Sequence, residues 1–137
     1  MSLPVFEFSF PGPLRDRLVA AVLDGSKTST TGLLRGYEVE GAPLREVGSR
    51  AAVIDSDGRQ VAVIEITSVR VVPLGDVDLA HVLDEGEGLT TVAEWRSVHE
   101  EGWHSDAERA ELGDPTFTVD DTTPLVLQRF RLGADLR

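Results

Sequence analysis

The sequence predicts an α+β protein in which helices flank a small, mostly antiparallel sheet that closes into a β-barrel. Three observations favour this class. A nearly continuous β-branched run spans residues 61–72, a further apolar stretch spans residues 125–132, and helical patterns lie before and between these runs. Strands and helices that alternate irregularly along a short chain are typical of a mixed architecture around one core.

The length and the charge of the chain limit its organisation and its partners. At 137 residues, the chain is close to the commonest domain size, so residues 1–137 are predicted to form a single domain. The 24 acidic and 13 basic residues give a formal net charge of −11. This balance argues against a broad surface for duplex DNA, because phosphate contacts need clustered lysine and arginine. A small local basic pocket is compatible with it.

Two further features concern compartment and cofactor. The chain has no cysteine, which excludes disulfides, thiolate metal ligands and thiol catalysis. Residues 1–10 lack a basic region and contain Glu7, so they are a poor signal peptide, and no later run has the length of a membrane span. We therefore expect a cytoplasmic protein with no membrane partner.

The first half of the chain predicts one helix, a loop and a hairpin. Pro13 suits a first helical position, and Gly25 suits the residue that ends the helix. The apolar residues of one helical face are Leu14, Leu18, Ala21 and Val22. Glycines and a proline punctuate residues 32–49, which predicts a loop. Residues 51–55 and 61–72 are predicted to pair as strands across a turn at Asp57 and Gly58.

The second half predicts three helices and a last strand. Residues 77–83 have the pattern of a short helix. Thr91 and Glu94 have the spacing of a capping box, which begins a helix that carries Trp95 and His99 on one face. The same spacing recurs at residues 105–108, in a helix that ends near residue 113. The final strand covers residues 125–132.

Residues 25–31 hold the densest chemistry of the chain, a run of hydroxyls around one lysine. Lys27 is the only nitrogen base of this stretch, and Thr30 is a candidate nucleophile of the kind that an adjacent base activates. The preceding helix C-terminus favours the ammonium form of Lys27. A straight strand here would point Lys27 and Thr30 to opposite faces, so their convergence requires a bend. The stretch is not a P-loop, because no glycine immediately precedes the lysine and the helix comes before the motif.

A second polar stretch, residues 84–88, alternates carboxylates with glycines. It is too short for a dinucleotide-binding fingerprint, and Glu85 and Glu87 are its candidate functional groups. The three histidines of the chain, at positions 81, 99 and 104, are too irregularly spaced for a metal site. The sequence therefore predicts neither a metal nor a cofactor. The indole of Trp95 is suited either to the core or to stacking on a base.

An ordered set of motifs covers nearly the whole chain. It comprises Gly25-x-Lys27-x-x-Thr30, Tyr37-Glu38, Gly41-x-Pro43-Leu44, Val47-Gly48, the turn from Asp55 to Gly58, Glu85-Gly86-Glu87-Gly88, Trp95-Arg96-x-x-His99 and Arg129-Phe130-Arg131. In this order the set resembles the bacterial subgroup of the ASCH domain family that was formerly known only as a domain of unknown function. The resemblance implies a PUA-like β-barrel with flanking helices, related to modules that bind RNA or modified nucleosides.

The resemblance also implies an activity. Some small ASCH proteins hydrolyse the amide of N4-acylated cytidines through the lysine and threonine of G-x-K-x-x-T and a later glutamate. These positions correspond to Lys27, Thr30 and Glu85, although Glu87 is an alternative for the carboxylate. Thr30 would then attack the acyl carbonyl, Lys27 would take its proton or hold the oxyanion, and Glu85 would protonate the leaving amine. If the carboxylate lies close to Lys27, we expect the lysine to hold the oxyanion and Glu85 to act as the base.

The alternative is a binding module for RNA or a nucleotide, or a ribonuclease, as proposed for other members of the family. In that interpretation Lys27 and Arg35 contact phosphate, and Tyr37 or Trp95 stacks on a base. The residues predicted to contact a substrate or ligand are Arg35, Tyr37, Glu87, Trp95 and His99.

Overall fold

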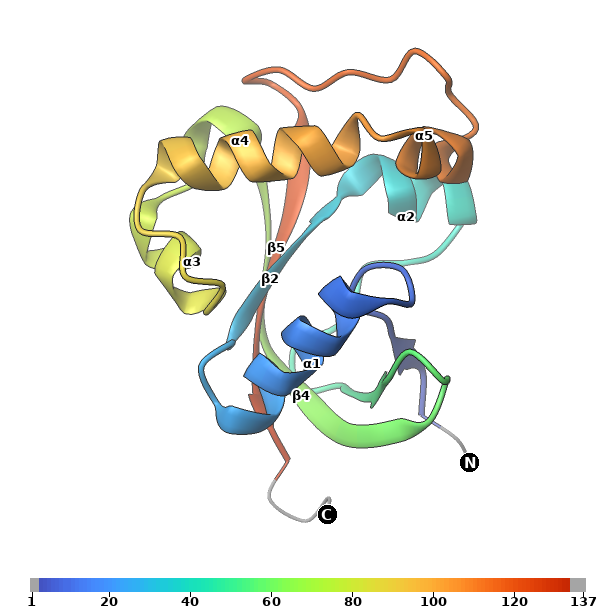
Figure 1. Cartoon of the computed structure of the whole chain (residues 1–137), viewed down its shortest axis with the longest axis vertical. Helices are drawn as coiled ribbons and strands as arrows, with labels where there is room; N and C mark the ends of the chain where they lie inside the picture. The colour runs from blue at the N-terminus through green and yellow to red at the C-terminus, as the bar shows by residue number, and fades with distance from the viewer. Residues whose placement is uncertain (1–2, 134–137) are drawn as a thin grey trace.

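The architecture is a five-stranded mixed sheet with helices on both of its faces, seen in a computed structural model that describes residues 3–133 (Figure 1). The strands are β1 (Val5–Phe6), β2 (Ser29–Leu33), β3 (Arg50–Ile54), β4 (Gln60–Pro73) and β5 (Pro124–Leu132), in the order β1-β3-β4-β5-β2. β1 and β3 are parallel and the other pairs are antiparallel. Over the described residues β1 and β2 are the two edges, so the α+β class is confirmed but the closed barrel is not.

The helices are α1 (Pro13–Asp24), α2 (Leu34–Glu40), α3 (Leu79–Asp84), α4 (Val92–Trp103) and α5 (Asp106–Leu112), with a 3-10 turn, η1 (Leu74–Asp76). Figure 1 shows α2, α4 and α5 gathered at one end of the sheet and α1 apart from them. In the part of the chain that the structure describes, no helix has both the length and the apolarity needed to cross a membrane.

The local signals for helix ends are confirmed. Gly25 ends α1 in the left-handed conformation, with φ 86°, and its N–H donates to the Val22 carbonyl. The Thr91 side chain accepts from the N–H of Glu94 at the start of α4, and Ser105 caps α5 in the same way. These hydrogen bonds satisfy backbone groups that a helix end leaves without partners.

Two details of the helices differ from the predictions. The segment predicted as a loop contains α2, a seven-residue helix that tolerates Gly36 and ends at Gly41 with φ 65°. The buried face of α1 also differs, because Val19 and Val22 are buried while Leu14 is exposed. Arg15 turns inward instead, where its guanidinium donates to the carbonyls of residues 9 and 55. The spacing of apolar residues cannot predict this arrangement, because a guanidinium becomes buried only when backbone carbonyls elsewhere in the fold accept its hydrogen bonds.

The sheet separates two apolar cores. On one side, Phe130 of β5 packs with α1, the first strands and the N-terminal segment. On the other side, Leu33 and Leu127 pack with η1, α3, α4 and α5. The register pairs Thr30 of β2 with Gln128 of β5, so these two side chains share the face of Phe130, whereas Thr31 shares the face of Leu33. The edge strand β2 therefore presents different polar groups to each side.

Candidate functional site

A cavity of about 550 Å³ opens beside the edge strand β2, between the N-terminal segment and α1 on one side and α4 and α5 on the other. Six of the predicted residues line it, namely Lys27, Thr30, Tyr37, Glu85, Glu87 and His99. Arg35 and Trp95 are not among the described residues that line it. The two polar stretches of the sequence thus meet at one cavity, although residues 27 and 85 are far apart along the chain.

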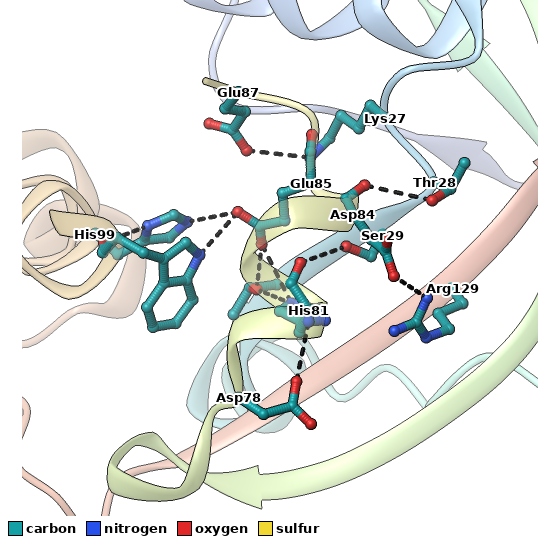
Figure 2. A network of polar contacts seen from close by, with 12 residues as sticks. Lys27, Thr28, Ser29, Asp78, His81, Asp84, Glu85, Glu87, His99 and Arg129 are labelled. Atoms are coloured by element: carbon teal, nitrogen blue, oxygen red, sulfur yellow. Dashed lines mark hydrogen bonds and ion pairs between the residues drawn. The ribbon is translucent and has the colours of Figure 1, made fainter. Parts of the chain in front are cut away.

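Lys27 is held in the wall of this cavity by both its backbone and its side chain. Its N–H donates to the Ala21 carbonyl over 3.0 Å, which bends the chain between α1 and β2. The residue is 2% exposed, and Nζ donates to Glu87 Oε2 over 3.2 Å and to the Glu85 carbonyl over 3.4 Å. Figure 2 shows Lys27 and Glu87 facing one another. A buried ammonium needs such acceptors, because an unpaired charge in the interior is strongly unfavourable.

Gly86 explains why the acidic stretch can approach Lys27 so closely. Its φ is +66°, and a Cβ built on it would stand 2.2 Å from the Ser26 carbonyl oxygen and 2.9 Å from the Lys27 nitrogen. Any side chain at position 86 would therefore collide with backbone atoms. The glycine lets the loop that carries both carboxylates rest directly on the chain that carries the lysine.

Glu85 is the centre of a buried hydrogen-bond network and is 1% exposed. Its Oε1 accepts from Trp95 Nε1 over 2.8 Å, and its Oε2 accepts from the Thr31 hydroxyl over 2.5 Å. His81 Nε2 lies 3.3 Å from Oε2, and His99 Nε2 lies 3.5 Å from Oε1. Figure 2 shows Glu85 between the two histidines. Both carboxylate oxygens are thus already engaged by protein donors.

These donors decide the protonation state of Glu85. Burial alone would raise its pKa, but the hydrogen bond from His81, the charges of Lys27 and His99, and the hydrogen bond from Thr31 outweigh that effect and lower the pKa of Glu85 to about 2. A carboxylate with so low a pKa is a weak base. We conclude that Glu85 is suited to holding its neighbours in place rather than to accepting a proton.

Glu87 has the opposite character. Its side chain is 21% exposed, and burial together with the nearby charge of Glu85 raises its pKa, although Lys27 partly opposes this effect. Two neighbouring carboxylates whose pKa values are pushed apart are typical of sites in which one group transfers a proton and the other stays charged. Of the two carboxylates, Glu87 is therefore the stronger base.

The hydroxyls of β2 divide between the two faces of the sheet. The Thr31 hydroxyl, for which no sequence motif indicated a role, binds both Glu85 and His81 Nε2, the latter over 2.7 Å. The Thr30 hydroxyl has no hydrogen-bond partner among the described residues. Successive side chains of a strand point to opposite faces of the sheet. Thr30 and Thr31 can therefore be assigned to different faces once the strand and its partner are known.

Two of the residues predicted to contact a ligand, Trp95 and Arg35, do not line the cavity. Trp95 is 0% exposed, and its indole binds Glu85 while its ring stacks on His99, with 4.3 Å between centroids. It offers no free face to a base, although its predicted position on one helix face with His99 is confirmed. Arg35 lies 3.7 Å from Asp114 in an ion pair outside the cavity.

Three of the cavity groups have an arrangement that is able to hold a metal ion. One ligand atom each from Glu85, Glu87 and His99 lies within 4.8 Å of the other two. His99 also directs Nδ1 to the Trp95 carbonyl over 2.9 Å, which leaves Nε2 facing the carboxylates. However, the Lys27 ammonium already neutralises Glu87, and a metal would have to compete with it.

Comparison with protein-family models and solved structures identifies the class of protein to which this fold and polar cavity belong. The model of the ASCH domain family matches residues 6–133, so the chain belongs to the ASCH domain family. No curated protein matches the chain.

Solved structures share the fold. An ASCH domain from Lactobacillus crispatus JV V101 is similar with a TM-score of 0.80 and 27% identity, over 96% of this chain and 79% of that one. The protein EF3133 from Enterococcus faecalis V583 has a TM-score of 0.81 at 24% identity, over 95% and 76% of the two chains. The hypothetical protein PH0355 is more distant, with a TM-score of 0.56 and 13% identity over 86% and 93% of the chains.

Proposed function

We propose that this ASCH domain hydrolyses the amide of N4-acylated cytidine-type nucleosides, with Thr30 as nucleophile, Lys27 as oxyanion holder and Glu87 as the proton-transferring group. The observation that carries the proposal is the ion pair between the buried Lys27 and the partly buried Glu87, with 3.2 Å between Nζ and Oε2, in the wall of a cavity that Thr30 also lines. A cavity of about 550 Å³ lies within the usual range for small-molecule sites.

In the first step, the Thr30 oxygen forms a bond to the acyl carbon while its proton passes to the Glu87 carboxylate. The raised pKa of Glu87 makes it a better proton acceptor than an ordinary carboxylate. The carbonyl oxygen becomes an oxyanion, which the Lys27 ammonium stabilises. A charged lysine suits this role, whereas a proton-accepting lysine would have to be neutral beside Glu87.

In the second step, the bond between the acyl carbon and N4 breaks, and the Glu87 carboxylic acid returns its proton to the leaving amine. This produces cytidine and an ester on Thr30. Water then attacks the ester while Glu87 takes its proton. The bond between the acyl carbon and the Thr30 oxygen breaks, Glu87 returns the proton to that oxygen, and the carboxylic acid leaves. Glu85 takes no part in proton transfer and acts as a positioning residue, because its low pKa keeps it charged and bound to Trp95 and Thr31.

The charges around the cavity favour a neutral ligand over a polyanion. Its lining includes the carboxylates Glu7, Glu85, Glu87 and Glu108 against the cations Lys27 and Arg45. Both cations that an RNA-binding mode would use are already paired, Lys27 with Glu87 and Arg35 with Asp114. Together with the net charge of −11, this pairing supports a nucleoside rather than RNA as the ligand.

The test is turnover of N4-acetylcytidine by the purified protein, followed by chromatographic release of cytidine. Thr30→Ser keeps an attacking hydroxyl and should retain some turnover, whereas Thr30→Val should abolish it. Lys27→Arg keeps the positive charge and should retain part of the rate. Arg35→Ala is the matched control, since its ion pair lies outside the cavity, and should behave as wild type. Equal turnover by wild type and Thr30→Val would exclude Thr30 as the nucleophile.

A further inference from the structure

Gln128 is a polar side chain of the cavity to which the reaction above gives no role. It lies on β5, is 2% exposed, and shares a face of the sheet with its cross-strand partner Thr30. Its Nε2 donates to the Tyr37 hydroxyl over 2.9 Å. Its Oε1 is buried and has no hydrogen-bond partner among the described residues. A buried acceptor without a partner is unfavourable, so an N–H donor from a ligand would stabilise this position.

Tyr37 completes a pair of complementary groups. One of its ring carbons lies 3.6 Å from the point where a Cβ on Gly32 would stand, so the ring rests against the edge strand. Because the Tyr37 oxygen accepts from Gln128, the hydroxyl proton remains available for donation. Both residues line the cavity together with Thr30. The wall of the cavity thus contains an unpaired acceptor, Gln128 Oε1, on a side chain that also binds a donor, the Tyr37 hydroxyl.

We propose that Gln128 and Tyr37 form a clamp for the N4–H and N3 edge of a cytosine-type base. Gln128 Oε1 accepts from N4–H, and the Tyr37 hydroxyl donates to N3. The inference rests on the proposed function, because the acyl group of the substrate is attached to the N4 that the clamp holds beside Thr30. It adds a specificity rule, namely that the substrate amide must carry a hydrogen on N4.

The rule follows from the cost of leaving Gln128 without a partner. A site built to hydrogen-bond a substrate N–H rejects an analogue that lacks it, because the buried polar group stays unpaired. N4,N4-dimethylcytidine keeps N3 but has no N4–H, so it isolates the contribution of Gln128. Tyr37 contributes through N3, which both nucleosides contain.

The experiment measures binding of cytidine and N4,N4-dimethylcytidine by calorimetry to wild type, Gln128→Met and Tyr37→Phe. Wild type should bind cytidine roughly tenfold or more tightly than the dimethyl analogue. Gln128→Met, close in volume but without an amide, should lose this preference by weakening cytidine binding. Tyr37→Phe should weaken both nucleosides by a similar factor and keep the preference. Thermal unfolding of each variant verifies that it is folded.

Equal binding of the two nucleosides to wild type would overturn the clamp. A preference for cytidine that survives in Gln128→Met, or an absence of cytidine binding to wild type, would also overturn it. Hydrolysis of N4-acetylcytidine, measured in parallel, separates the two proposals. Turnover without the preference contradicts the clamp and leaves the hydrolase intact. The preference without turnover supports the clamp and contradicts the hydrolase.

Discussion

Replacing Glu85 by glutamine removes the charge at the centre of the buried network with little change of shape. The pKa of Glu85 is lowered from 4.5 to about 2, a difference that corresponds to about 3 kcal/mol of stabilisation by the charged form. Glu85→Gln should therefore reduce the free energy of unfolding at pH 7 by about 3 kcal/mol. This is a large share of the ~5–15 kcal/mol that a small domain typically has.

The stability difference between wild type and Glu85→Gln should decrease as the pH falls. Because the folded-state pKa of Glu85 is depressed, its contribution is fully present above pH 4.5 and is lost as the pH falls toward about 2. The difference in stability between wild type and Glu85→Gln should thus be constant above pH 4.5. Below that pH it should close, because the wild-type carboxylate becomes protonated and also loses its charge.

Urea unfolding, followed by tryptophan fluorescence, measures this difference at each pH. Trp95 reports on the site directly, since its indole binds Glu85. Glu87→Gln is the matched control, because the raised pKa of Glu87 means that folding favours its neutral form, and the substitution should cost less than Glu85→Gln. A cost of Glu85→Gln under about 1 kcal/mol at pH 7, or a difference that persists unchanged to pH 2, would show that the charge of Glu85 does not stabilise the fold.

Three further predictions concern the same chain. Gly86→Ala should cost about 2–4 kcal/mol in urea unfolding, because it adds a backbone collision to an unfavourable φ. Gly88→Ala, which has the strained φ but open space, should cost only about 1 kcal/mol, and equal losses would contradict the collision. Thr91→Ala should lower the stability by about 1 kcal/mol through loss of the cap of α4, and an unchanged melting temperature would argue against it. Turnover should fall as the pH drops through the raised pKa of Glu87, and an acid limb at or below 4.5 would contradict its role as base.

The sequence alone determined the features that depend on neighbours along the chain. Gly25 ends α1, Thr91 begins α4, and the turn at residues 55–58 joins β3 to β4, because caps and turns act over a few residues. The glycine–carboxylate alternation at residues 84–88 also predicted two candidate groups, Glu85 and Glu87, and both line the cavity. The reason for a glycine at position 86 could not be predicted from the sequence. The backbone atoms that a Cβ there would strike belong to Ser26, on another segment.

The tertiary structure decided what each of the polar groups can do. Only the fold brings Thr31, His81 and Trp95 onto Glu85, and these contacts, rather than any motif, help to hold its pKa low and make it a poor base. The closed barrel is not confirmed, and the prediction of a continuous loop at residues 32–49 was wrong because α2 lies within it. Both outcomes depend on tertiary contacts. Strand closure and the short helix α2 depend on contacts between distant segments. The free energy of such contacts exceeds the intrinsic preference of a short segment for helix, strand or loop.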